Sequence, residues 1–202
     1  MIDFVATFIV FFAVIDPIGT VPVFVAVTSN HGEADKRKIA VQATIISALI
    51  LIFFVMAGEV ILDAIGIPLP AFQVAGGIVL FLFALTMIFG ESKPEEEVKL
   101  VRPARDTAVF PLSVPSIASP GAMLAAVMQT ENAVFSLSQQ LQVTSMMLAV
   151  LVVVLVLMLG ASFVIRLIGD SGASVISRVM GLILASVAAE SVLSGLSQYF
   201  SI

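Results

Sequence analysis

Long uninterrupted apolar stretches dominate the chain. Six of them are long enough to cross about 30 Å of hydrocarbon, which takes about 20 helical residues, and they lie near residues 4–28, 39–62, 71–90, 109–128, 144–168 and 174–199. They show no alternation of apolar and polar positions, so a membrane β-barrel is excluded and helices remain. We predict an all-α integral membrane protein with six transmembrane helices, forming a single domain over residues 1–202.

The composition agrees with this pattern and removes several classes of function. Hydrophobic residues make up 60% of the chain, charged residues only 11%, and the mean hydropathy is +1.17. Cysteine is absent and His31 is the single histidine, so neither a disulfide nor a thiolate or histidine-rich metal centre is available. No catalytic motif or phosphate-binding loop occurs either. We expect no enzyme activity, no metal or other cofactor, and no nucleic-acid partner.

The basic residues are distributed unevenly among the connections between spans. All nine fall between spans 1 and 2, between spans 3 and 4, or around the turn between spans 5 and 6: Lys36, Arg37, Lys38, Lys93, Lys99, Arg102, Arg105, Arg166 and Arg178. Because basic connections stay on the cytoplasmic side, we predict a bacterial inner-membrane protein with both termini in the periplasm. The segment of about residues 91–107 would be a cytoplasmic linker.

A pair of prolines five positions apart occurs in the middle of two spans. Pro17 and Pro22 lie in the first span, and Pro115 and Pro120 lie in the fourth, at an offset of 98. Residues 72–80 also match residues 176–184 at an offset of 104. Since each unit holds three spans, an odd number, the matches predict a 3+3 inverted repeat, about 1–92 and about 106–202, each with a broken first helix. The alternative is an old duplication whose symmetry serves only packing.

The paired prolines also predict where a solute binds. Proline inside a helix removes a donor and costs about 3 kcal/mol or more, so two of them should unwind a segment, and unwound backbone at membrane depth lines protein or a polar cavity. Freed amides suit a carboxylate and freed carbonyls suit an ammonium group, which together fit a zwitterionic amino acid. Kinked packing helices, with serines bonded to their own carbonyls, are the alternative. The candidate substrate-binding residues are Asp16, Pro17, Gly19, Thr20, Pro22, Pro115, Ser116, Ser119, Pro120 and Gly121.

Two acidic residues lie well inside the spans. Asp16 precedes the first proline, where its carboxylate can cap the half-helix that starts at Pro17, or bind substrate or a coupling proton. These roles are compatible, and the sequence leaves both open. Glu190 in the sixth span is the second candidate for proton coupling.

The chain resembles the MarC family (UPF0056) of bacterial membrane proteins. The resemblance rests on Asp16-Pro17-Ile18-Gly19 with Pro22 and Phe24, and on Phe110-Pro111, Pro115 and Ser119-Pro120-Gly121, and it extends over essentially the whole chain. It implies kinship with LysE-like exporters and with SnatA-like transporters of small neutral amino acids such as glycine and alanine. We therefore expect a proton-coupled secondary transporter of this substrate class in the lipid bilayer. A channel or a non-transport membrane factor is the alternative, and a homo-oligomer is left open.

Overall fold

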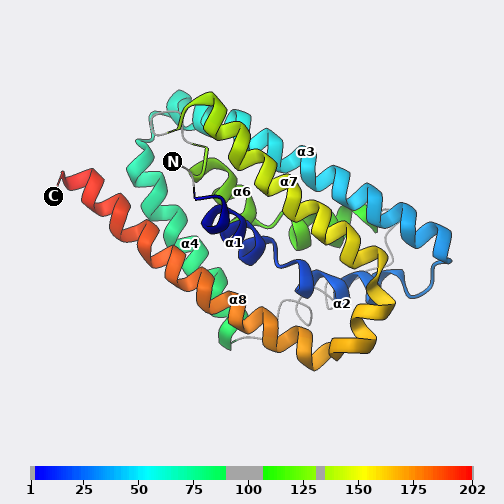
Figure 1. The fold of residues 1–202 in the computed structure, drawn as a ribbon. Coiled ribbons are helices and arrows are strands. Elements are labelled where there is room, and N and C mark those ends of the chain that lie inside the picture. Colours follow the sequence, from blue (N-terminus) through cyan, green and yellow to red (C-terminus); the bar gives the residue numbers. More distant parts are fainter. Residues whose placement is uncertain (1–2, 90–106, 131–134, 202) are drawn as a thin grey trace.

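The computed structural model describes residues 3–89, 107–130 and 135–201, and this part of the chain is helical with no strand. Five of its helices are long and apolar enough to cross a membrane, and a sixth crossing results if one bent helix pair counts as a span. Both ends of the chain lie at the same end of the bundle (Figure 1). The prediction of an all-helical, multi-pass membrane protein is therefore confirmed.

The first span consists of two helices separated by a single residue. Asp3 caps the start of helix α1 (Phe4–Ile15), because its Oδ1 accepts hydrogen bonds from the amides of Val5 and Ala6. The helix ends at Asp16, which has φ 51° and ψ 69°. Helix α2 (Pro17–Thr28) starts immediately afterwards. The chain restarts the helix at once because the first helical position tolerates proline and the residue before it supplies the cap.

The predicted extent of this first break was wrong. Pro22 lies inside the continuous helix α2, and the backbone is not unwound between Pro17 and Pro22. Only Asp16 leaves the helical conformation. Pro22 still removes the donor that the carbonyl of Ile18, four residues earlier, would normally bond.

The fourth span is broken between Pro115 and Pro120, the segment that the proline pair marks in the sequence. Residues Ala108–Ile117 form the irregular helix η1, whose backbone leaves the helical conformation at Phe110 and Val114, before the cis peptide bonds to Pro111 and Pro115. Helix α6 (Pro120–Met128) follows at an angle of 54°. The break therefore lies after Pro115, and Ser119 caps α6 with Pro120 at its first position. Each broken span thus has a helix that starts at a proline directly after its cap, which is Asp16 in the first span and Ser119 in the fourth.

The second and third spans follow the prediction more closely. Helix α3 (Glu33–Ile65) is longer than expected because its first turn is polar and carries Glu33 and Asp35, which favour a helix N-terminus. It ends at Gly66, whose φ of 71° gives the left-handed C-terminal cap that glycine adopts most readily. Helix α4 (Leu69–Phe89) then runs back.

The predicted bounds of the fifth span were wrong. Helix α7 (Leu137–Leu159) starts at a capping box formed by Ser136 and Gln139, and it ends at Gly160. Helix α8 (Ala161–Phe200) bends at Gly169, which has φ 68°, and its spanning part is Ser171–Phe200. Residues 161–168 thus form a separate short helical arm. Hydropathy merged this apolar arm with α7 and missed the polar first turns of α7.

The two broken spans lie at the centre of the bundle. In the spanning window of α1 and α2, 67% of the residues are buried, against 22–33% for the four long helices around them. Helices α3 and α7 run side by side on one side of the broken spans, and α4 and α8 run along the other (Figure 1). Any polar group at the breaks is therefore enclosed by protein.

Glycines bring the backbones of α4 and α8 into contact. A Cβ added at Gly77 would lie 2.9 Å from the carbonyl oxygen of Ala188, and one added at Gly181 would lie 3.2 Å from that of Ala84. Gly77 and Gly181 are 104 positions apart, and so are Ala84 and Ala188, so the two contacts are reciprocal. Small residues of this kind are what permits close helix packing in membranes.

The described basic residues lie away from the chain termini. Lys36, Arg37 and Lys38 are in the first turns of α3, Arg166 is in the short arm of α8, and Arg178 Nη1 donates to the carbonyl oxygen of Ile88 at 2.7 Å. The turns that carry them are at the opposite end of the bundle from both termini (Figure 1). The predicted linker falls almost wholly outside the described residues.

Candidate functional site

Asp16 lies at the middle of the first broken span and has no exposed surface. Its Oδ1 accepts a hydrogen bond from the amide of Gly19 at 3.0 Å, and its backbone carbonyl accepts one from the Thr20 hydroxyl at 3.1 Å. The capping role is thus present in the structure. No lysine or arginine of the described residues forms an ion pair with this carboxyl group.

The second oxygen of the Asp16 carboxyl group contacts the last span. Ser177 Oγ on α8 donates to Oδ2 at 2.7 Å, and this serine is also fully buried. Gly19 allows the two side chains to meet, because a Cβ at residue 19 would clash with the carboxyl group and lie 2.6 Å from Ser177 Oγ. One carboxyl group therefore links α1, α2 and α8.

The second break contributes hydroxyl groups to the same region. Ser119 Oγ accepts from the amide of Ala122 at 3.1 Å and donates to the carbonyl oxygen of Val14 on α1 at 3.3 Å. Ser116 Oγ donates to Thr20 Oγ1 at 3.3 Å. The two broken spans are thus joined by hydrogen bonds between buried side chains.

These contacts bear on the alternative of kinked packing helices. Thr20 does bond back to a carbonyl of its own span, as that alternative expects. Ser116 and Ser119 instead reach across to the other broken span. Their hydroxyls therefore link the two breaks. Of the three residues, only Thr20 bonds in the way that the alternative of kinked packing helices expects.

Each half-helix also begins with an amide that lacks a partner. Neither the amide of Ile18 in α2 nor that of Gly121 in α6 has a hydrogen-bond acceptor among the described residues. The two helix starts differ in charge, because Asp16 caps α2 with a carboxyl group whereas Ser119 caps α6 with a hydroxyl. The break regions thus present an acidic group and an uncharged helix N-terminus, which attracts anions.

The remaining predicted site residues have packing roles in the structure. A Cβ at Gly121 would lie 2.9 Å from Leu80 Cδ2 and 3.0 Å from Val14 Cγ1, so this glycine admits neighbouring helices. Pro22 and Pro115 lie inside α2 and η1, away from the capped helix starts, whereas Pro17 and Pro120 occupy those starts.

A cavity of about 410 Å³ opens beside the N-terminal end of α1; we call it the terminal cavity. Its polar lining includes Asp3, Gln73, Gln129 and Glu190, whereas Asp16 does not line it. Glu190 lies about 20 Å further along α8 than Ser177, by the 1.5 Å rise per residue of a helix. The structure therefore does not bring Glu190 to Asp16. No cluster of three or more histidine, aspartate or glutamate side chains suited to a metal occurs in the described part of the chain.

Ser177 is not among the site residues that the sequence predicts. Its position was visible as a polar residue within the stretch 176–184 that matches 72–80, where it is equivalent to Gln73. Nothing in a sequence spacing of 161 residues indicates that it contacts Asp16. This partner emerges only from the packing of α8 against the first break.

Comparisons with known proteins show which proteins the chain is similar to. The model of the MarC family integral membrane proteins matches residues 1–200. A UPF0056 membrane protein of Archaeoglobus fulgidus is 34% identical over 96% of this chain and 92% of its own length. The UPF0056 membrane protein YvbG of Bacillus subtilis is 34% identical over 98% of this chain and 96% of its own. The chain has no significant match among solved structures. This chain therefore belongs to the MarC family of integral membrane proteins.

Proposed function

We propose that the protein is a secondary transporter of small neutral amino acids, of the glycine and alanine class, and that protons drive it. The observation that carries the proposal is the fully buried Asp16 carboxyl group at a one-residue helix break, opposite a second break capped by a neutral serine. An ionisable residue inside a membrane bundle is characteristic of a solute or proton pathway. Broken helices at mid-membrane are characteristic of transporter binding sites.

The two helix starts fit the two ends of a zwitterion. We place the substrate ammonium group near the Asp16 carboxyl group and the Ile18 carbonyl, which Pro22 leaves without its helical donor. We place the substrate carboxylate at the N-terminus of α6, where the Gly121 amide is unpaired and no acidic cap competes. The buried, closely packed surroundings favour a small side chain on the substrate.

The helix contacts support an inverted repeat as the basis of alternating access. The long helices pack against their counterparts, α3 against α7 and α4 against α8, and the broken spans pack in a reciprocal way, α1 against α6 and α2 against η1. Contacts between the halves recur in equivalent pairs, since α3 packs on η1 and α6 while α7 packs on α1 and α2. Reciprocal contacts of this kind are expected from two units related by a two-fold axis in the membrane plane.

The proposed orientation places both termini and the terminal cavity in the periplasm. The described lysines and arginines lie at the other end of the bundle, which the positive-inside rule assigns to the cytoplasm of a bacterial inner membrane. A reporter fused to the C-terminus and active only in the cytoplasm tests this, and activity of that reporter would contradict the orientation.

Flux measurements on the full-length protein in liposomes test the transport activity. Labelled glycine or alanine should enter in a saturable way and respond to a pH gradient, whereas a channel would give flux that does not saturate. The Asp16→Asn variant should keep exchange but lose the response to the gradient. Asn also caps helices and tolerates a positive φ, so this change separates charge from capping.

Asp63→Asn is the matched control, because Asp63 is an exposed carboxylate at the end of α3. This variant should behave like the original protein. Absence of flux for every small neutral amino acid would refute the proposed function. Intact proton dependence in the Asp16→Asn variant would leave Asp16 with the capping role alone.

A further inference from the structure

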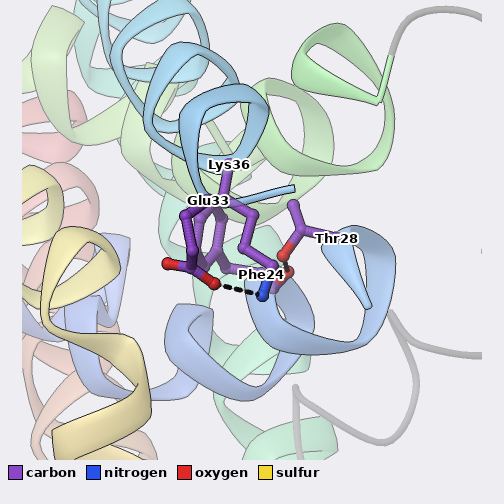
Figure 2. A network of polar contacts seen from close by, with 4 residues as sticks. All are labelled: Phe24, Thr28, Glu33 and Lys36. Atoms are coloured by element: carbon purple, nitrogen blue, oxygen red, sulfur yellow. Dashed lines mark hydrogen bonds and ion pairs between the residues drawn. The ribbon is translucent and has the colours of Figure 1, made fainter. Parts of the chain in front are cut away.

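A second cavity, distinct from the breaks, lies where α2, α3 and the turn from α7 to α8 meet. It has a volume of about 130 Å³, and we call it the basic cavity. Figure 2 shows part of its wall: the Lys36 ammonium group contacts Glu33 Oε1 at 2.9 Å, and Thr28 Oγ1 donates to the carbonyl oxygen of Phe24 at 2.6 Å. Neither the site at the breaks nor the terminal cavity shares these residues.

The charged side chains that line the basic cavity are suited to an anion. Lys36 and Arg37 bring two positive charges against the single negative charge of Glu33. Arg37 and Ser162 line the cavity, both are exposed, and neither side chain donates a hydrogen bond to a described residue. Helices α3 and α8 start here without a side-chain cap, but α2 and α7 end here, so the helix ends offset one another and the basic side chains carry the positive charge.

Apolar residues also line the basic cavity, and some of them are exposed on the surface of the bundle. Phe24, Met158 and Leu159 line it, and Leu159 is 51% exposed on the outer surface of the bundle. Val25, 37% exposed, forms a second apolar edge. A ligand that fits has a negatively charged group next to a hydrocarbon chain, and the membrane itself supplies such molecules.

We propose that the basic cavity binds the headgroup of an anionic phospholipid such as phosphatidylglycerol. The headgroup phosphate contacts Arg37, Lys36 and the Ser162 hydroxyl, and an acyl chain follows the surface beside Leu159. Basic side chains at the membrane surface attract anionic lipids in this way. A bound lipid links the turn between α2 and α3 to the turn between α7 and α8, and it therefore stabilises this end of the bundle.

Native mass spectrometry of the full-length protein in mild detergent tests the proposal, with phosphatidylglycerol and phosphatidylcholine added at matched concentrations. Phosphatidylglycerol should bind and raise the unfolding temperature, and phosphatidylcholine should do neither. Arg37→Gln and Lys36→Gln should each weaken phosphatidylglycerol binding roughly fivefold, from the energy of about one basic residue at an anionic membrane surface. Lys38→Gln is the matched control, because Lys38 is adjacent in sequence but does not line the cavity.

Glu33→Gln provides a test that loss of folding cannot imitate. Removing the one negative charge should strengthen phosphatidylglycerol binding, although it also removes the ion pair with Lys36. Weaker binding in this variant would overturn the proposal, as would an equal loss in Lys38→Gln. Inorganic phosphate at millimolar concentration should neither compete nor stabilise, and an equal effect of free phosphate would assign the cavity to a soluble anion instead.

Discussion

The hydrogen bond between Ser177 and Asp16 gives the sharpest test of the site. Both residues are fully buried and the bond is 2.7 Å long. Replacing Ser177 by Ala removes one oxygen and leaves Asp16 Oδ2 without its only side-chain donor among the described residues. Alanine adds no atoms, so a clash does not complicate the change. The variant should be less stable and should transport more slowly.

Two estimates limit the size of the effect. Leaving a buried acceptor unsatisfied costs about 1–3 kcal/mol, whereas hydrogen bonds between membrane helices average only about 0.6 kcal/mol with a maximum near 1.7. The bond to Asp16 belongs near the upper end, since it is short and its acceptor is a carboxyl group without an ion-pair partner among the described residues. We expect a loss of about 1.5 kcal/mol in the free energy of unfolding.

Reversible unfolding of the protein in mixed micelles, followed by circular dichroism, measures this loss. Ser186→Ala is the control, because Ser186 is exposed on the same helix and bonds only to the carbonyl oxygen of Leu182. In the Asp16→Asn background the effect of Ser177→Ala should fall by about half, since hydrogen bonds to charged groups are roughly twice as strong as neutral ones. An effect no larger than that of Ser186→Ala would refute the reasoning.

Three further predictions follow from the glycines and from Glu190. Gly19→Ala should abolish flux and destabilise the protein by about 2 kcal/mol, because its Cβ would lie 2.6 Å from Ser177 Oγ; Gly32→Ala, where a Cβ meets nothing within 4 Å, is its control. Gly77→Ala and Gly181→Ala should each lower the free energy of unfolding by about 1–3 kcal/mol. A loss outside that range in only one of the two variants would contradict the reciprocal packing of α4 and α8. Glu190→Gln should change the apparent affinity in flux assays but keep the response to a pH gradient, because Glu190 lines the terminal cavity and not the breaks.

The sequence predicted the helical class and the location of the first break because both depend on local properties. Apolar runs and proline chemistry act over a few residues, so Asp16-Pro17 marks the break directly. The second proline pair also encloses the second break, but the spacing does not show which proline of a pair starts a helix. Pro17 and Pro120 start helices, whereas Pro22 and Pro115 lie inside them.

Other errors arose where hydropathy and local structure disagree. The polar turn that begins α7 lowered the local hydropathy, although the spacing of Ser136 and Gln139 already indicated a capping box. Gly160 ends that helix within an apolar stretch, which hydropathy cannot register. The contact between Ser177 and Asp16 depends on how α8 is placed against the first break, and no local pattern encodes it.

The reciprocal glycine contacts have a mechanical consequence. Where Gly77 meets the backbone of Ala188 and Gly181 meets that of Ala84, the glycine has no side chain of its own that could rotate to follow a sliding helix. Shear between α4 and α8 would separate both contacts together, so the two helices should move as one rigid body. A change of shape that exposes Asp16 must then come from hinge motion elsewhere. Disulfide cross-links between α4 and α8 should therefore leave transport intact, whereas a cross-link between α2 and α8 should stop it.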